Sequence, residues 1–144
     1  MHSGHFAMFQ HILVAYDGSE VSERAFRTAV ALAQAFSGRV RVVSVCEVPP
    51  APLDALPVAI EDERAWIENA LAGLVRSVPA SECAVDSELA FGVPANALLD
   101  QASMHAVDHI VLGRTGKGAV QRLLLGSVSR DIVTRSKVGV TLVP

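Results

Sequence analysis

His109-Ile-Val-Leu-Gly-Arg-Thr-Gly116 and, after a nine-residue spacer, Gly126-Ser-Val-Ser129 are the two segments that decide the fold of this chain. Residues 109–112 form a short apolar run, which predicts a buried parallel strand, and residues 131–135 are expected to continue as a helix. The glycines therefore lie between the end of a strand and the start of a helix. Because glycine has no Cβ and tolerates positive φ, main-chain N–H groups at these positions can approach a bulky anion closely.

The last helix is expected to begin at Gly126, with Ser127 and Ser129 in its first turn. N–H groups at a helix start have no partner inside the helix and lie at the positive end of the helix dipole, so both features favour phosphate oxygens there. The two serine hydroxyls are expected to be additional donors. The alternative interpretation is a glycine-containing loop followed by a helix with ordinary solvated cations.

The charge distribution supports the anion-binding interpretation. Of the 12 Lys and Arg in a chain of net charge −3, half lie between residues 114 and 137, where the only acid is Asp131. These basic residues are Arg114, Lys117, Arg122, Arg130, Arg135 and Lys137. The slightly acidic overall balance argues against a nucleic-acid partner bound through a broad basic face, because such binding needs a summed positive field.

The rest of the chain alternates between strand and helix patterns. Apolar, β-branched runs predict strands over residues 11–16, 40–46, 85–91, 108–112 and 138–143. Helical spacing of apolar residues predicts a first helix that is capped by Ser19 and stopped by Gly38, a second that Pro79 ends, and a third that Pro94 begins. Strict alternation implies an α/β fold with a parallel five-stranded sheet, right-handed crossovers and helices on both faces. Ligands of such sheets bind beyond the carboxyl ends of the strands, where the winding direction reverses.

The segment from Glu47 to Ala59 holds four of the seven prolines, a density that excludes a helix or the interior of a sheet. We therefore expect a semi-extended surface loop at the ligand-binding end. Trp66, in the second helix, is expected to pack in the core.

Composition favours a single small domain. With 144 residues and 51% hydrophobic content, the chain can bury a core without disulfides or metals. We expect a flexible tail over residues 1–8 and one domain over residues 9–144. No apolar run reaches the ~18 residues that span a bilayer, which predicts no membrane association.

Cysteines and histidines suggest neither a disulfide framework nor a metal centre. Cys46 and Cys83 are the only cysteines, so a reducing cytoplasm is the expected location and both are expected to be free thiols. His2 and His5 would be half of a metal site, but no further ligands accompany them. We assign no metal role to any histidine.

The spacing Gly-x2-Gly-x9-Gly-Ser, formed by Gly113, Gly116, Gly126 and Ser127, resembles the nucleotide-binding pattern of the universal stress protein family. The resemblance extends from Phe9 to Pro144 and implies a Rossmann-like open sheet with strand order 3-2-1-4-5. That order would place Asp17 beside Gly113 at the reversal point. The pattern also implies membership of the branch that binds ATP. Thr115 and Gly139 depart from the family, the latter by replacing a proline that often begins the last strand.

The resemblance implies a role for each matching residue. Ala15 and Asp17 would approach the nucleoside, and Val45 would pack near adenine. The ribose and phosphates would lie along the segment from Gly113 through Arg114 to Gly116, and the triphosphate on Gly126, Ser127, Val128 and Ser129. Mg²⁺ or Mn²⁺ would be carried by the phosphates, and Asp17 would accept a hydrogen bond from a ribose hydroxyl or hold that ion. The alternative for Asp17 is a turn residue that caps the first helix.

Three functions remain open at this point. The leading one is a regulatory ATP-binding protein of the stress response. A slow ATP hydrolase is the alternative among enzymes, although no residue stands out as the base that hydrolysis needs. The third is a structural dimer with an empty site.

The last predicted strand, residues 138–143, lies at a sheet edge in this strand order and carries no internal charge, proline or bulge to protect it. We expect antiparallel pairing of this strand with its copy in a homodimer, as members of the family commonly do, and expect Thr141→Pro to disrupt it. A monomer whose edge is covered by the N-terminal tail is the alternative.

Overall fold

The computed structural model describes residues 8–47, 56–115 and 125–144, with residues 56–60 described in their backbone only. Five parallel strands form one sheet in the order β3-β2-β1-β4-β5, which confirms the predicted fold class and strand order. The elements are β1 (His11–Ala15), α1 (Glu20–Phe36), β2 (Arg39–Cys46), α2 (Leu56–Arg76), β3 (Ala84–Phe91), α3 (Pro94–Met104), β4 (His109–Gly113), α4 (Ser127–Arg135) and β5 (Gly139–Val143).

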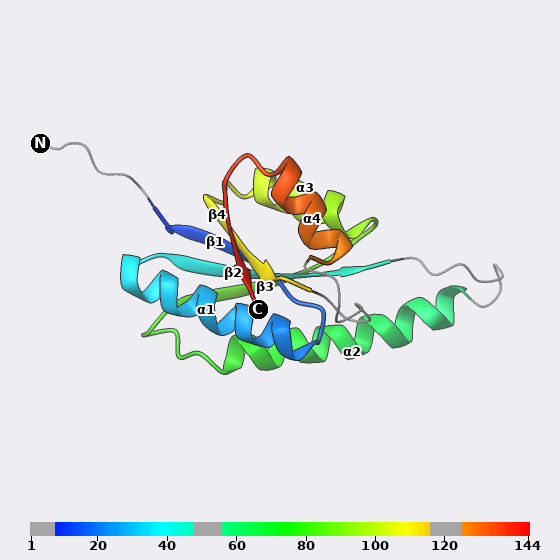
Figure 1. The fold of residues 1–144 in the computed structure, drawn as a ribbon. Coiled ribbons are helices and arrows are strands. Elements are labelled where there is room, and N and C mark those ends of the chain that lie inside the picture. Colours follow the sequence, from blue (N-terminus) through cyan, green and yellow to red (C-terminus); the bar gives the residue numbers. More distant parts are fainter. Residues whose placement is uncertain (1–7, 48–55, 116–124) are drawn as a thin grey trace, which may run out of the picture.

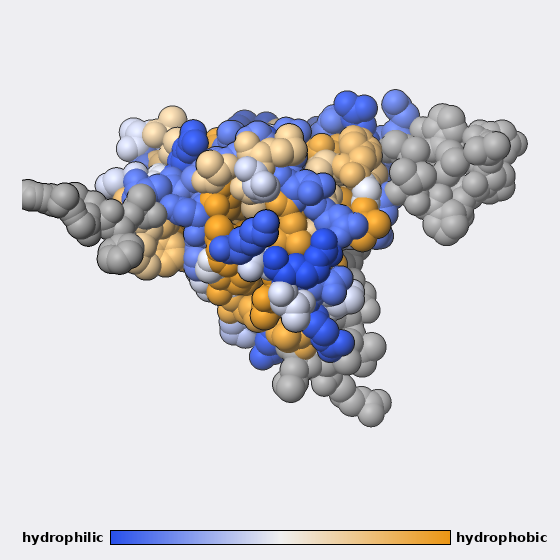
Figure 2. Space-filling view, turned by 90° about the horizontal axis from the view of Figure 1, so that it is seen from above, coloured by the Kyte–Doolittle hydropathy of each residue, from blue (hydrophilic) through white to orange (hydrophobic). Residues whose placement is uncertain are grey.

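Helices cover both faces of the sheet, with α1 and α2 on one side and α3 and α4 on the other (Figure 1). The side chains of β1 alternate between these two layers: Ile12 and Val14 pack with α1 and α2, whereas Leu13 packs with α3 and α4. All three are fully buried, as expected for a central strand of a parallel sheet. Seen from the α3 and α4 side, hydrophilic and hydrophobic residues are interspersed on the surface (Figure 2).

The ends of α1 were located correctly, but the reason for Gly38 is different from the expected one. Ser19 caps the helix as predicted, because its side chain accepts a hydrogen bond from Ser22 N at 3.2 Å. At the other end, Ser37 rather than Gly38 adopts the left-handed conformation, with φ of 57°. Glycine is needed at position 38 because a Cβ there would collide with the Phe9 carbonyl oxygen.

The structure corrects the predicted extent of the proline-rich loop. Helix α2 begins at Leu56, inside the segment that was expected to be a loop up to Ala59. Pro57 lies in the first turn of this helix, where its missing N–H costs no hydrogen bond. Neither α2 nor any other helix in the described parts of the chain is long and apolar enough to cross a bilayer.

Gly139, which departs from the family pattern, is explained by its neighbour on β4. His109 pairs with Gly139 in register, and a Cβ on Gly139 would come within 2.8 Å of His109 Nδ1. The other ring nitrogen, Nε2, lies 2.7 Å from the Thr141 hydroxyl. The imidazole therefore lies over the start of β5 and requires a residue without a side chain there.

The two central strands separate at their carboxyl ends. Pairing between β1 and β4 stops at Val14 and Val111. Beyond that point β1 stays with β2, since Tyr16 N donates to Val43 O at 2.9 Å, and β4 stays with β5 as far as Gly113. The sheet thus opens between β1 and β4, at the place where the winding reverses and where ligands bind in such folds.

Candidate functional site

A cavity of about 540 Å³ lies over the opening between β1 and β4. It is within the range of 300–1,000 Å³ that is typical of small-molecule sites. Its walls come from both layers of helices, which makes it a crevice across the sheet edge rather than a gap in one layer. The lining residues include Ala15, Tyr16, Asp17, Val43, Val45, Glu47, Glu63, Trp66, Ile67, Pro94, Leu98, Leu112, Gly113, Thr115, Gly126, Ser127, Val128 and Ser129.

The start of α4 forms one end of this cavity. Gly126 is the N-cap, its N–H donates to Arg114 O at 2.9 Å, and its carbonyl accepts the first intrahelical bond, from Arg130 N at 3.0 Å. By helix geometry, the N–H groups of Ser127, Val128 and Ser129 have no acceptor inside the helix. All three residues line the cavity. This end of the cavity therefore offers hydrogen-bond donors and the positive end of a helix dipole, a combination that suits anions.

The Ser129 hydroxyl is not the additional anion donor that the sequence suggested. Ser129 is only 3% exposed, and its Oγ donates to Gly113 O at 2.7 Å. This bond ties the first turn of α4 to the end of β4, so the hydroxyl supports the site while the backbone N–H remains directed along the helix axis. Ser127, which is exposed, retains the expected position on the cavity wall.

Gly113 is needed for packing as well as for access. A Cβ at this position would collide with the Val21 side chain of α1 and come within 3.0 Å of Thr115 O. Gly126 differs, because its φ of −72° is open to any residue. Substitution at Gly126 therefore adds a side chain beside the cavity without forcing the backbone into a strained conformation.

Arg114 contributes through its backbone. Its N–H donates to Val143 O at 2.7 Å and its carbonyl accepts from Gly126, so it connects β5 to the start of α4. Its side chain is exposed and Arg114 is not among the residues that line the cavity, so the predicted phosphate contact stays a prediction. Gly116, with Lys117 and Arg122 of the predicted basic cluster, lies outside the described residues.

Asp17 closes the turn before α1 and also lies on the cavity wall. Its Oδ1 accepts hydrogen bonds from Ser19 N at 3.0 Å and from Ser19 Oγ at 2.6 Å, which closes the turn before α1. The residue also lines the cavity. The turn role is confirmed, although Ser19 rather than Asp17 caps α1, and the predicted contact of Asp17 with a ribose hydroxyl or an ion stays a prediction.

Acidic groups gather at the α1 and α2 side of the cavity. Glu47 and Glu63 line it together with Asp17. Burial raises the pKa of the Tyr16 hydroxyl, and nearby Glu23 and Asp17 raise it further, so this phenol remains protonated at neutral pH. The cavity therefore has an electropositive end at α4 and an electronegative side at α1 and α2.

Ala15 and Val45 line the cavity, and they continue into an apolar wall that the sequence does not predict. Its other members are Val43, Pro94 and Leu98. Pro94 and Leu98 lie at the start of α3, directly after the carboxyl end of β3. Their place in the sequence could have indicated this role, because residues that follow a parallel strand lie at the ligand-binding end of the sheet.

Trp66 does not belong to the core, and this corrects the expectation from the sequence. It is 52% exposed and forms part of the cavity wall. Its neighbour Ile67 is buried against the core cluster on the α1 side of the sheet. Trp66 therefore lies at the edge of the buried face of α2 and extends toward the cavity.

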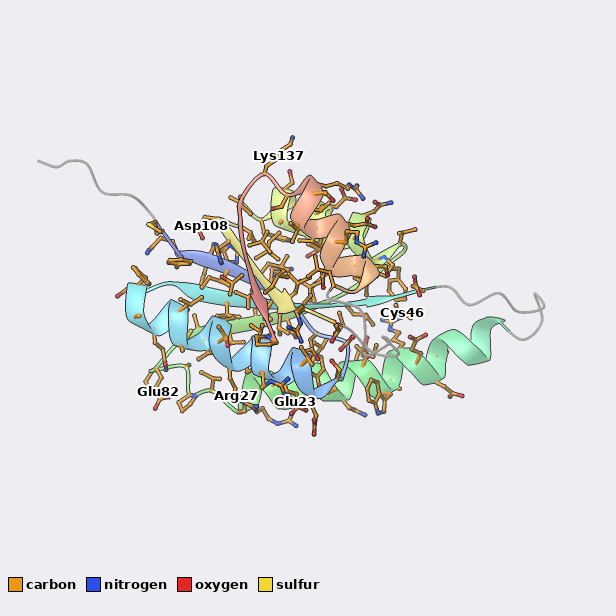
Figure 3. The ribbon with its side chains drawn as sticks, viewed as in Figure 1. Glu23, Arg27, Cys46, Glu82, Asp108 and Lys137 are labelled. Carbon is orange, nitrogen blue, oxygen red and sulfur yellow. The ribbon has the colours of Figure 1, made fainter. Side chains whose placement is uncertain are left out.

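The cysteines are free thiols, as predicted, and both are buried. Cys46 ends β2 near α2 (Figure 3), and burial raises the pKa of its thiol, with a further increase from Glu63. Burial also raises the pKa of the Cys83 thiol, which lies directly before the amino end of β3. Within the described ranges, no three His, Cys, Asp or Glu residues are grouped so as to hold a metal ion.

Fold and cavity together define an open α/β protein with an anion-compatible site at its topological switch point, and comparisons with known proteins agree. A model of the universal stress protein family matches residues 8–144. A protein of Thermus aquaticus, described as a universal stress protein in the QAH/OAS sulfhydrylase 3′ region, is 39% identical over 142 residues, which cover 94% of this chain and 99% of that protein. The chain therefore belongs to the universal stress protein family.

Solved structures show the same fold. Universal stress protein UspA from Lactobacillus plantarum superposes with a TM-score of 0.87 at 26% identity, over 94% of this chain and 98% of that one. A universal stress protein in complex with cAMP gives a TM-score of 0.73 at 24% identity, over 94% and 98%. The protein from Archaeoglobus fulgidus in complex with dAMP gives 0.69 at 21% identity, again over 94% and 98%.

Proposed function

We propose that this chain is a regulatory ATP-binding protein that holds the nucleotide in the cavity between β1 and β4. The observation that carries the proposal is the start of α4, where Ser127, Val128 and Ser129 direct N–H groups without intrahelical acceptors into a cavity of nucleotide size. The glycine spacing from Gly113 to Gly126 supports the same ligand.

The charge pattern of the cavity supports one orientation of the nucleotide. The phosphates belong at the start of α4, because the carboxylates of Asp17, Glu47 and Glu63 repel them from the other side. The apolar wall that contains Ala15 and Val45 suits the adenine ring. Mg²⁺ or Mn²⁺ would enter with the phosphates, and Asp17 is a candidate carboxylate for that ion or for a ribose hydroxyl.

The related structures widen the choice of ligands to test. One of them was solved with cAMP and another with dAMP. A panel of ATP, AMP, cAMP and dAMP therefore compares a triphosphate with monophosphates, and a cyclic phosphate with open ones. A slow ATP hydrolase is the second candidate. Turnover near the ~1–100 s⁻¹ of kinases that disappears in Asp17→Asn would favour hydrolysis over regulation.

Thermal unfolding of protein freed of nucleotide tests ATP binding. A ligand that binds only the native state stabilises it by RT ln(1 + [L]/Kd), about 2.7 kcal/mol at a hundredfold excess over Kd. We expect Mg-ATP to raise Tm in the wild type and to have no effect in Gly126→Val, because the added side chain blocks approach to the α4 N–H groups.

Gly73→Val is the matched control, since it adds the same side chain at a position of α2 that does not line the cavity and where a Cβ would contact nothing. It should retain the full shift in Tm. An unchanged wild-type Tm at millimolar Mg-ATP would refute ATP binding, and a full shift in Gly126→Val would refute the assignment of the phosphates to α4.

A further inference from the structure

The indole of Trp66 is the most exposed large apolar group on the cavity wall. It is the only tryptophan of the chain and is 52% exposed. An indole ring offers a large planar apolar surface, and about half of this one is exposed beside a ligand cavity.

The position of this ring is fixed by its surroundings. Glu63, Trp66 and Ile67 lie on one face of α2, at spacings of three and four residues, and all three line the cavity. Ile67 is buried in the core and anchors that face. On its other side the ring lies against Gly18, where a Cβ would come within 2.6 Å of Trp66 Cη2. Gly18 also has a positive φ of 88°, so both the turn and the close approach of the ring depend on it.

The charges around Trp66 indicate which part of a nucleotide can lie next to it. Glu63 precedes it by one helical turn, and Asp17 is adjacent to Gly18 in the turn that the ring contacts. Two carboxylates beside the indole disfavour phosphates at this place, whereas the start of α4 attracts them. The group beside Trp66 is therefore the uncharged part of the ligand.

We propose that Trp66 contacts the nucleoside moiety of the bound nucleotide and makes the cavity selective for nucleotides over inorganic polyphosphate. This inference rests on the proposed function and adds to it a residue outside the glycine pattern. Planar aromatic side chains bind nucleobases by stacking, largely regardless of the base. The contact would thus raise affinity for nucleosides in general and leave the choice of base to other residues.

Calorimetric titration of Mg-ATP and of inorganic tripolyphosphate tests the proposal in wild type, Trp66→Phe and Trp66→Leu. The Leu variant should bind ATP roughly 5- to 100-fold more weakly, the range that aromatic–base contacts cover, and the Phe variant should retain most of the affinity. Tripolyphosphate affinity should not change in either variant. Wild-type tryptophan fluorescence should respond to ATP and not to tripolyphosphate.

Met104→Ala is the control, because it truncates a 70% exposed side chain at the far end of α3 and should bind like the wild type. Two results in a wild type that binds ATP would contradict the proposal. Either the ATP affinity of Trp66→Leu lies within about twofold of the wild-type value, or its affinity for tripolyphosphate falls by the same factor as its affinity for ATP. Absence of ATP binding in the wild type would contradict the proposed function and this inference together.

Discussion

Ser129 and Trp66 are the residues whose roles in the site were hardest to read from the sequence. The hydroxyl of Ser129 donates to the carbonyl oxygen of Gly113, 16 residues away, and no local sequence pattern encodes a contact between the end of β4 and the first turn of α4. Trp66 precedes the buried Ile67, and helical periodicity cannot distinguish a large ring in the core from one at its edge. Family resemblance, rather than any local pattern, singled out Asp17, Ala15 and Val45, and all three line the cavity, while their contacts with a nucleotide stay predictions.

His109 provides a prediction at the same scale. Burial lowers the pKa of its imidazole below the ordinary 6.5, although Asp108 acts in the opposite direction. The folded chain therefore holds this proton less tightly than the unfolded chain. The stabilisation is fully present above pH 6.5 and is lost as the pH falls through the folded pKa, because protons then favour the unfolded state.

We expect His109→Gln to reduce the decrease in Tm between pH 7 and pH 5, since glutamine can still bond to Thr141 but does not titrate. Part of the decrease in Tm should remain in this variant, because burial and Arg39 lower the pKa of His11 as well. Thermal scans across this range measure the effect. A variant with the same pH dependence as the wild type would show that His109 is not responsible.

At the level of elements, the predicted strands and helices agree with the structure except at their ends. Apolar β-branched runs located all five strands, and Ser19 and Pro94 marked the starts of α1 and α3 correctly. The sequence does not predict the start of α2, because its proline density disfavours a helix interior, whereas Pro57 occupies a first turn that tolerates proline. Strand order came from family resemblance, since alternation of elements alone does not fix it.

Two glycines allow a matched test of why glycine occurs in these elements. In α2, a Cβ on Gly73 would contact nothing, so Gly73→Ala should stabilise the protein by about 0.5–1 kcal/mol through helix propensity. At the end of β4, Gly113→Ala should destabilise it by about 1–3 kcal/mol, because the new methyl group collides with Val21. Denaturant unfolding measures both changes in the free energy of unfolding, provided that variant and wild type have equal m-values. The packing explanation fails if Gly113→Ala is as stable as the wild type.

At the scale of the whole molecule, the open edge of β5 supports the proposed homodimer. Within the described residues β5 pairs only with β4. Val143 O accepts from the N–H of Arg114, directly after β4, and the backbone groups of successive strand residues alternate in direction, so those of Gly139 and Thr141 also point to β4. The outward N–H groups therefore belong to Val140 and Leu142. Thr141→Pro, the substitution first suggested by the sequence, would break the sheet of the monomer instead.

Val140→Pro is the sharper test of this interface. It removes an outward N–H from an edge strand, where a monomer tolerates proline, and should convert the dimer to a monomer. Val140→Ala removes most of the same side chain but keeps the N–H, so it should remain dimeric. Light scattering at micromolar concentration measures both masses. A dimeric proline variant, or a monomeric wild type, would rule out pairing through β5.

The central claim is that the start of α4 holds the phosphates of a nucleotide, and amide NMR during a titration with Mg-ATP tests it most directly. A phosphate oxygen that accepts from the N–H groups of Ser127, Val128 and Ser129 must change their ¹H and ¹⁵N shifts, while amides at the amino edge of the sheet, such as Asp108, should change little. We predict that the α4 amides are among the most strongly shifted and that titration with tripolyphosphate shifts them too. Saturable ATP binding that leaves these three amides unmoved would contradict the account.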